Sequence, residues 1–430
     1  MDYVNIINQP TKKENSFLSK LQYVMVFLLI YISSSFYFGT MPGIITLTLH
    51  FMCIFILFTL SLLCGKKISI NSKMAIKAIV LILIIGIGSL SAIGDESKQT
   101  IINILYILIA YLYALNFEFD SFIKKFADVL YFLCWYSIIV YFINLLLPDV
   151  ISLLPDIKNV NGLVAKNAGF STIYNWENAR NQSVFWEPGA FQTYINIALI
   201  IEFFYGKTLN KKRLIIYSIA LFTTYSTTGY ITALFIVYAY VVQLLLSSKK
   251  EDKSHMRNIF FILTIVIVVI VVFVSMESSL ANQVFGKLAN FRDSGYNTSG
   301  GKMSSASVRF DAFIRPFKVF WHYPMFGAGT RGMTNFAINE RYNMNTCTFV
   351  NWFAYFGIFF GAMILRMYYK FAKRFSNNKL IVFMIFFAIF LATATENYYR
   401  NPSILIFAFF PLINKEEDKK NENLIEYQQL

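Results

Sequence analysis

Charged side chains are scarce in this sequence of 430 residues: only 14% are charged, whereas 57% are hydrophobic and 18% are aromatic. The apolar residues cluster in long blocks and follow neither strand alternation nor a heptad. This pattern excludes a soluble enzyme and a coiled coil. We therefore expect an all-α polytopic membrane protein.

Cysteine is also rare, and its spacing is uninformative. The chain has four cysteines, and they lie in or beside apolar runs: Cys53, Cys64, Cys134 and Cys347. This distribution excludes a disulfide framework and a paired-cysteine metal site, and it favours packing roles.

Histidine is rarer still, with three residues in the chain. His50 falls inside a predicted helix and His255 in a basic cytoplasmic segment, which leaves His322 on the outer face. The outer residues cannot build a Ser-His-Asp order, an HExxH motif, an acidic metal cluster or a phosphate-cradling glycine loop. We expect neither a metal nor another cofactor.

The sequence shows no internal repeat and no Pro- or Ser-rich linker, so residues 1–430 are expected to form one integral membrane domain. The net charge is +14, which alone would suggest a nucleic-acid partner. The basic residues instead follow a membrane topology. We expect membrane lipids, and no nucleic acid, as partners.

The apolar runs predict about twelve transmembrane helices. The uncharged stretch Leu214–Ser248 would be about 52 Å long as one helix, against a hydrocarbon core of about 30 Å. Basic residues flank both of its ends, so we expect two crossings with a turn at Tyr225–Tyr230, where Gly229 relieves the backbone. The predicted spans are approximately 21–39, 44–63, 76–92, 101–116, 127–147, 189–205, 214–227, 229–246, 259–275, 348–365, 380–396 and 403–413.

The distribution of Lys and Arg places the amino terminus in the cytoplasm. The first span has no small-residue cleavage site behind it and is expected to be retained. Two long segments, 148–188 and 276–347, then lie outside the cytoplasm. The last span, 403–413, is short for a full crossing.

The first outer segment ends in a dense group of charges at the edge of a span. Arg180 precedes Glu187, and Pro188 is suited to the first turn of a helix, so the Glu187 carboxylate is expected at a helix amino terminus. It could simply stabilise the helix dipole there. With Arg180 and the neighbouring Trp176 and Trp186 it could instead hold an anionic, sugar-bearing ligand, although an interfacial aromatic belt equally explains the tryptophans.

The second outer segment contains "SSASVRFDAFIRPFKVFWHYPMFGAGTRG", residues 304–332, which is basic and amphipathic. Such a segment often rests on anionic headgroups. Its guanidinium groups could instead bind a lipid diphosphate through paired oxygens. Arg309 and Arg331 flank the Gly327–Gly329 turn and are the candidates for that role, and His322 and Tyr323 lie between them as further substrate-binding candidates. Two other basic residues are expected at the surface: Arg315 and Lys318.

Four stretches resemble the O-antigen polymerases of the Wzy type and the O-antigen ligases. These stretches are "NARNQSVFWEPGAFQTYINIAL", "STTGYI", "SVRFDAF…HYPMFGAGT" and "TCTFVNWFAYFGIFFG", the last at the position where a segment re-enters the membrane. They fall within residues 178–361, and their order is more specific than any one of them.

The resemblance implies a membrane-embedded glycosyltransferase in the plasma (inner) membrane of a bacterium, acting in lipopolysaccharide or capsule synthesis. Its donor would be an undecaprenyl-diphosphate-linked oligosaccharide, and a chain-length regulator protein is a further candidate partner. Arg180 and Arg309, with Arg331, would hold the donor diphosphate, and Glu187 would position or deprotonate the acceptor hydroxyl. Developing charge on the leaving diphosphate can be stabilised by guanidinium groups without a metal.

Two other functions stay open. Ligases of this kind usually carry a His before the re-entering helix, where this chain has Asn345, Thr346 and Cys347, so the pattern favours a polymerase over a ligase. A transporter or flippase of lipid-linked oligosaccharide would tend to have ionisable residues at mid-membrane, whereas Glu202 and Glu396 lie near span ends. The charged outer segments argue against a non-catalytic assembly subunit.

Overall fold

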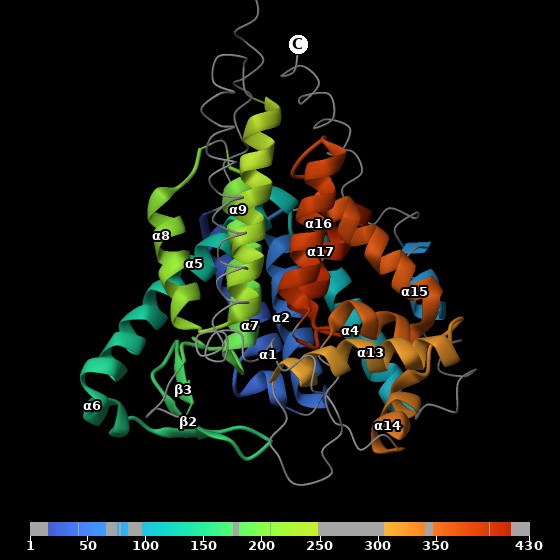
Figure 1. The fold of residues 1–430 in the computed structure, drawn as a ribbon, viewed down its shortest axis with the longest axis horizontal. Coiled ribbons are helices and arrows are strands. Elements are labelled where there is room, and N and C mark those ends of the chain that lie inside the picture. The colour runs from blue at the N-terminus through green and yellow to red at the C-terminus, as the bar shows by residue number, and fades with distance from the viewer. Residues whose placement is uncertain are drawn as a thin grey trace, which may run out of the picture.

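The structure is a computed structural model that describes residues 16–41, 43–65, 75–76, 79–84, 97–174, 180–206, 208–247, 305–339, 347–394 and 396–413. Within these ranges the chain is mostly helical. Long helices form a bundle, and a small sheet and two further helices lie at one end of it (Figure 1).

Among the described residues, six helices are long and apolar enough to cross a membrane. They are α1 (Ser16–Ser34), α2 (Gly43–Leu63), α4 (Ser97–Asn116), α5 (Phe119–Leu146), α9 (Thr227–Ser247) and α15 (Thr348–Ala372). Two apolar helices are shorter: α16 (Lys379–Thr393) and α17 (Pro402–Ile413). The helices α7 (Pro188–Phe204) and α8 (Lys211–Thr223) also belong to the bundle. The chain is therefore a polytopic membrane protein. Of the other predicted spans, 259–275 and most of 76–92 lie outside the described residues.

The bundle is apolar on its outside as well as in its core, as expected for helices surrounded by lipid. Phe55 and Leu63 on α2 are 71% and 78% exposed, whereas Phe122 and Phe126 on α5 are fully buried. The buried rings pack edge to face, for example Phe126 against Phe407 of α17 at a centroid distance of 5.1 Å. Such pairs contribute roughly 0.5–1.5 kcal/mol beyond their area.

Two helix boundaries differ from the prediction for identifiable reasons. The first span was expected over 21–39, but α1 ends at Ser34 because Phe36 N–H donates to the carbonyl of Val184 and the chain then forms a short 3-10 turn, η1 (Phe38–Thr40). The span expected from 127 begins at Phe119. Charged residues fit inside α5 because Lys125 donates to Ser121 and Asp128 pairs with Arg213.

The predicted hairpin between α8 and α9 is present, with its turn at residues 224–226. The expectation for Gly229 was wrong: Tyr225 adopts the left-handed backbone, with φ of 48°, while Gly229 lies within the first turn of α9. Gly229 permits close packing instead, because a Cβ there would stand 2.9 Å from Cβ of Gln192 on α7. This contact packs the amino-terminal turns of α9 against those of α7.

The helix α15 is broken at Gly357, where φ is 77° and ψ is −177°. The break separates a half-helix, 348–356, from the longer part that follows. Two hydrogen bonds replace the intrahelical one that the break removes: Ile358 N–H donates to the carbonyl of Pro324, and Ala328 N–H donates to the carbonyl of Ala354. The Gly327–Gly329 turn therefore packs directly on the break, and both glycines have positive φ.

Both long segments predicted outside the cytoplasm contain ordered elements that the hydropathy pattern does not indicate. The first forms α6 (Pro148–Ser152) and an antiparallel sheet of β1 (Asp156–Lys158), β2 (Val164–Asn167) and β3 (Thr172–Tyr174). The second contains α13 (Ser305–His322) and α14 (Gly329–Asn339). In Figure 1 the sheet lies on one side of the bundle and α14 on the other, at the same end, and α13 lies across the bundle.

Candidate active site

The amino terminus of α7 presents a carboxylate. Pro188 occupies the first helical position, and Glu187 before it is extended, with φ of −160° and ψ of 163°. The carbonyl of Glu187 accepts from Ala190 and Phe191, whereas its side chain forms no capping hydrogen bond and is exposed. The Glu187 carboxylate is thus open to a ligand at the helix end.

A second carboxylate, that of Glu396, lies beside the first. Glu396 is buried, and it accepts a hydrogen bond of 3.1 Å from the indole nitrogen of Trp186. Gly189 separates the two acids: a Cβ there would overlap Oε1 of Glu396 and stand 3.6 Å from Oε1 of Glu187. A side chain at position 189 would displace the Glu396 carboxylate from its present position.

The loop that carries Glu396 is tied to the half-helix of α15. The hydroxyl of Thr348 donates to the carbonyl of Glu396 and accepts from the backbone N–H of Tyr398. Burial, together with the negative charge of Glu396, raises the pKa of the Tyr398 hydroxyl well above its ordinary value. Tyr398 therefore stays neutral in this site and does not serve as a base.

A polar cavity of about 170 Å³ opens next to these acids. Its walls come from α1, η1, α2, the middle of α4 and the start of α17, and from the segments that precede α7 and α17. They include Trp186, His50 and Arg400. The Arg400 guanidinium lies over the rings of Tyr106 and Tyr399, at 5.5 and 5.4 Å from their centroids. The site therefore combines two carboxylates, one guanidinium and several aromatic rings.

Arg400 also connects the cavity to α14. Its guanidinium reaches the side-chain oxygen of Asn103 at 3.5 Å, and the Asn103 amide donates to the hydroxyl of Thr330 at 3.3 Å. Thr330 precedes Arg331 on α14. Arg331 is exposed. The structure thus brings the predicted candidates Trp186, Glu187 and the segment with Arg331 toward one end of the bundle.

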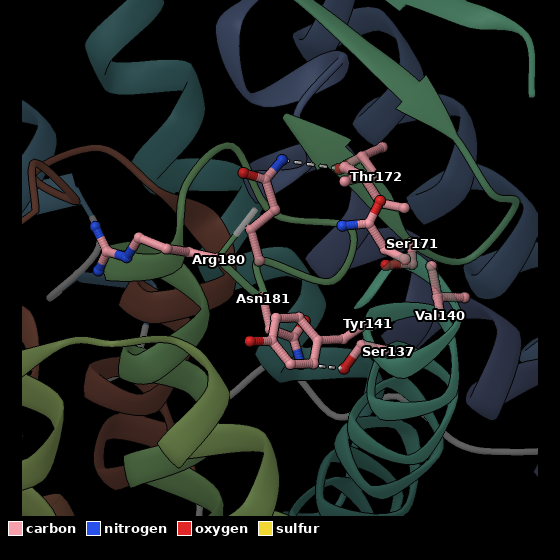
Figure 2. Close-up of a pocket in the computed structure, with 10 residues that line it drawn as sticks. Ser137, Val140, Tyr141, Ser171, Thr172, Arg180 and Asn181 are labelled. Atoms are coloured by element: carbon pink, nitrogen blue, oxygen red, sulfur yellow. Dashed lines mark hydrogen bonds between the residues drawn. The ribbon is translucent and has the colours of Figure 1, made fainter. Parts of the chain in front are cut away.

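Arg180 occupies a different place. Its Nε donates to the carbonyl of Thr224 at 2.8 Å, and a terminal nitrogen donates to the carbonyl of Tyr225 at 2.9 Å. It lines a small pocket with Ser137 and Ser171, and Figure 2 shows its guanidinium directed away from both serines. Arg180 therefore binds the carbonyls that end α8, which the sequence did not indicate.

The remaining candidates lie on α13 or directly after it. Arg309 is in the first half of this helix, and its side chain lies outside the described part of the chain. His322 and Tyr323 are exposed at its end, and no hydrogen bond or ion pair among the described residues joins them to Glu187. The expectation that Arg315 is a surface residue was wrong, because it is only 8% exposed, while Lys318 is exposed as expected.

Sequence reasoning missed Glu396 and Arg400 as site residues. Both are charges in a charge-poor chain and lie in a short loop between predicted spans, which is the signal that pointed to Glu187. Across the described residues, no group of three or more His, Cys, Asp or Glu side chains is arranged to hold a metal ion.

The described residues thus form a helical membrane protein with two neighbouring carboxylates at one end of its bundle. Comparison with known families finds one similarity: residues 214–352 match the family model Wzy_C, described as O-Antigen ligase. The family comprises ligases and polymerases of surface polysaccharide synthesis. No curated protein matches the chain.

The family match covers α8, α9, α13, α14 and the first turns of α15. It includes Arg309, Arg331, His322 and Tyr323. The two acids at Gly189 and the Arg400 cavity lie outside the matched residues, so their roles rest on the geometry of this chain alone.

Proposed function

We propose that this protein is a polymerase of surface polysaccharide repeat units. It transfers a glycan from an undecaprenyl-diphosphate-linked donor to a lipid-linked acceptor at the outer leaflet of a bacterial plasma membrane. The observation that carries the proposal is the exposed Glu187 carboxylate at the start of α7, paired with buried Glu396 beside a polar cavity. The family domain in residues 214–352 supports the same reaction class.

The proposed step uses Glu187 as the general base. Its carboxylate accepts the proton of the acceptor hydroxyl, the hydroxyl oxygen forms a bond to the anomeric carbon, and the bond from that carbon to the lipid diphosphate breaks. The leaving diphosphate gains negative charge, which Arg309 and Arg331 stabilise. The step needs no metal or nucleotide cofactor.

The residues before α15 favour a polymerase over a ligase. Where ligases of this kind carry a His, this chain has Asn345, Thr346 and Cys347, and Cys347 is buried at the start of the half-helix. The description of the matching family makes a ligase the second candidate. Deleting the gene separates them, because loss of a polymerase leaves single-unit caps on the cell surface and loss of a ligase leaves lipid-linked polymer unattached.

The decisive variant is Glu187→Gln, which keeps the side-chain shape and removes the base. General-base catalysis contributes about 10²–10⁴-fold to rate, whereas loss of a helix-dipole interaction costs only about 0.3–1 kcal/mol and would not abolish activity. We expect the purified variant to form polymer from lipid-linked repeat units at least about a hundredfold more slowly.

The matched control is Asp149→Asn, which removes an exposed carboxylate from the first turn of α6 and is expected to retain the parental rate. A Glu187→Gln protein that inserts normally and polymerises at the parental rate would show that Glu187 is not the base.

A further inference from the structure

The cavity beside Trp186 is built from polar groups of several distant segments. Ser33 and Thr46 contribute hydroxyls, Asn397 an amide and His50 an imidazole. His50 is fully buried, and its Nδ1 has no hydrogen-bond partner among the described residues. The other ring nitrogen, Nε2, bonds to the hydroxyl of Ser33 at 3.3 Å, so two polar side chains of this wall hold each other in place.

The size of the cavity limits the ligand to one small group. Its volume of about 170 Å³ is below the roughly 300–1,000 Å³ of pockets that enclose drug-sized ligands. It fits a single sugar ring, and a whole oligosaccharide repeat unit could enter only with one of its residues.

Arg400 gives the cavity a positive charge that the described acids do not neutralise. Among the described residues, its guanidinium donates one long hydrogen bond, of 3.5 Å to Asn103, and takes part in no ion pair. The guanidinium also lies over the rings of Tyr106 and Tyr399, which position it at the wall of the cavity. A planar guanidinium held in this way binds a carboxylate through two parallel hydrogen bonds.

Trp186 gives the same cavity an aromatic wall. Its indole nitrogen is bound to Glu396, and its ring packs near the ring of Tyr398 at a centroid distance of 5.6 Å. The indole is thus fixed in place before a ligand arrives, which reduces the ordering cost of binding. An apolar wall with hydroxyl, amide and imidazole groups around it suits a sugar ring.

We propose that this cavity is a subsite for one acidic sugar residue of the repeat unit, whose carboxylate binds Arg400 while its ring lies against Trp186. The proposal rests on the proposed function and deepens it, because it makes the substrate an anionic glycan. A diphosphate is the less fitting occupant: it carries more charge, and Arg400 is the one Lys or Arg among the described lining residues.

The test uses the full-length protein in nanodiscs and measures the binding of methyl glucuronide and methyl glucoside by ligand-observed NMR titration. These probes differ only at C6, which is a carboxylate in the glucuronide and a hydroxymethyl group in the glucoside. We expect the glucuronide to bind at least tenfold more tightly. Arg400→Gln should abolish that preference, Arg400→Lys should restore it in part, and Arg366→Gln, a matched change at an exposed arginine of α15, should leave it unchanged.

Equal binding of the two probes, or no binding of either, overturns the proposal. Inorganic diphosphate that binds more tightly than the glucuronide and loses affinity in Arg400→Gln would also overturn it, because the cavity would then be a phosphate site. The probe comparison on the parental protein keeps the test valid even if Arg400→Gln does not fold. Binding requires no turnover, so the subsite and the proposed polymerase activity succeed or fail separately.

Discussion

The thiol of Cys347 lies directly before α15 and is 1% exposed. Burial raises its pKa to about 11. The thiolate is the reactive form of cysteine, so only a very small fraction of Cys347 is reactive at neutral pH. This fraction rises with pH, and Cys347 is suited to packing and not to nucleophilic catalysis.

We therefore expect Cys347 to resist iodoacetamide at pH 7 in the folded protein and to react faster as the pH approaches 11. Mass spectrometry after timed labelling measures this. Cys64 is the internal comparison, because it is partly exposed and outside the helices. Rapid modification of Cys347 at pH 7, or a large loss of polymer formation in Cys347→Ala, would contradict the packing role.

Arg309 is the residue for which the shape of the charged group matters most in the proposed mechanism. A lysine keeps the charge but cannot reproduce the two-pronged contact of a guanidinium with phosphate. Losing one charge-assisted hydrogen bond costs about 1.5–3 kcal/mol, so we expect Arg309→Lys to slow polymer formation roughly tenfold to a hundredfold.

The matched control for Arg309→Lys is Lys318→Arg, with Lys318→Ala beside it, because Lys318 is exposed on the same helix. Near-parental turnover of Arg309→Lys, or an equal loss in the Lys318 variants, would assign α13 to nonspecific attraction of headgroups.

Among single residues, the sequence indicated Glu187 and Trp186 as site candidates but did not indicate the side chains that lie beside them. Scarcity of charge made Glu187 visible, and Pro188 placed it at a helix start. Glu396 is 210 residues from Trp186, and Arg400 is 297 residues from Asn103. Local patterns do not encode such contacts, which depend on how the helices pack.

Among the elements, the broken helix α15 has the most demanding local geometry. A Cβ at Gly357 would stand 2.5 Å from Cα of Phe326, and one at Gly327 would stand 2.5 Å from the backbone nitrogen of Phe356. The backbone of Gly357 also falls in a region that is essentially restricted to glycine. The close contact between the Gly327–Gly329 turn and the break in α15 therefore needs glycine in both segments.

We expect Gly357→Ala to lower the thermal stability of the purified protein strongly. Strain at such a backbone position costs about 1–3 kcal/mol, and the overlap with Phe326 adds to it. Gly65→Ala is the control, because Gly65 has a φ of 76° but nothing within 4 Å of its Cβ position. Gly65→Ala introduces strain from the positive φ without steric overlap. A melting temperature lowered equally in both variants would therefore show that the close contact between Gly357 and Phe326 is unimportant.

The sequence predicted these elements only in part. The glycines of residues 327–329 indicated a turn, and hydropathy indicated α15, but neither indicated that the turn would replace a helical hydrogen bond. The strands β1 to β3 are three or four residues long, which is too short for alternation to distinguish them from a loop. The Gly229 prediction failed because a turn sequence does not reveal which residue takes the left-handed backbone.

For the whole molecule, the predicted topology places the β1–β2 turn outside the cell and the α15–α16 loop inside. Single cysteines at Asn161 and Asn377, both exposed, test it in a background without the native cysteines. In intact cells, or in spheroplasts if there is an outer membrane, we expect an impermeant maleimide to label position 161 and to label position 377 only after lysis. The reverse pattern would invert the topology.

Hydropathy predicted the polytopic helical architecture, because a bilayer requires long apolar helices whatever their packing. It did not predict the cavity. The walls of the cavity come from α1, α2, α4 and α17 and from the segments before α7 and α17, and the sequence contains no pattern that joins them.

Hydrogen bonds next to the cavity also have a consequence for how the protein is made and inserted into the membrane. The Asn401 side chain donates to the carbonyl of Ser33, 368 residues earlier, and to the hydroxyl of Ser34. The hydroxyl of Tyr194 bonds to Ser34 and to Ser403, so α1, α7 and α17 share one polar junction. A nascent chain that has inserted every earlier helix still lacks this junction. The newly made protein therefore passes through a stage at which Ser34 and Tyr194 are in the membrane without their hydrogen-bond partners Asn401 and Ser403, because α17 has not yet been synthesised.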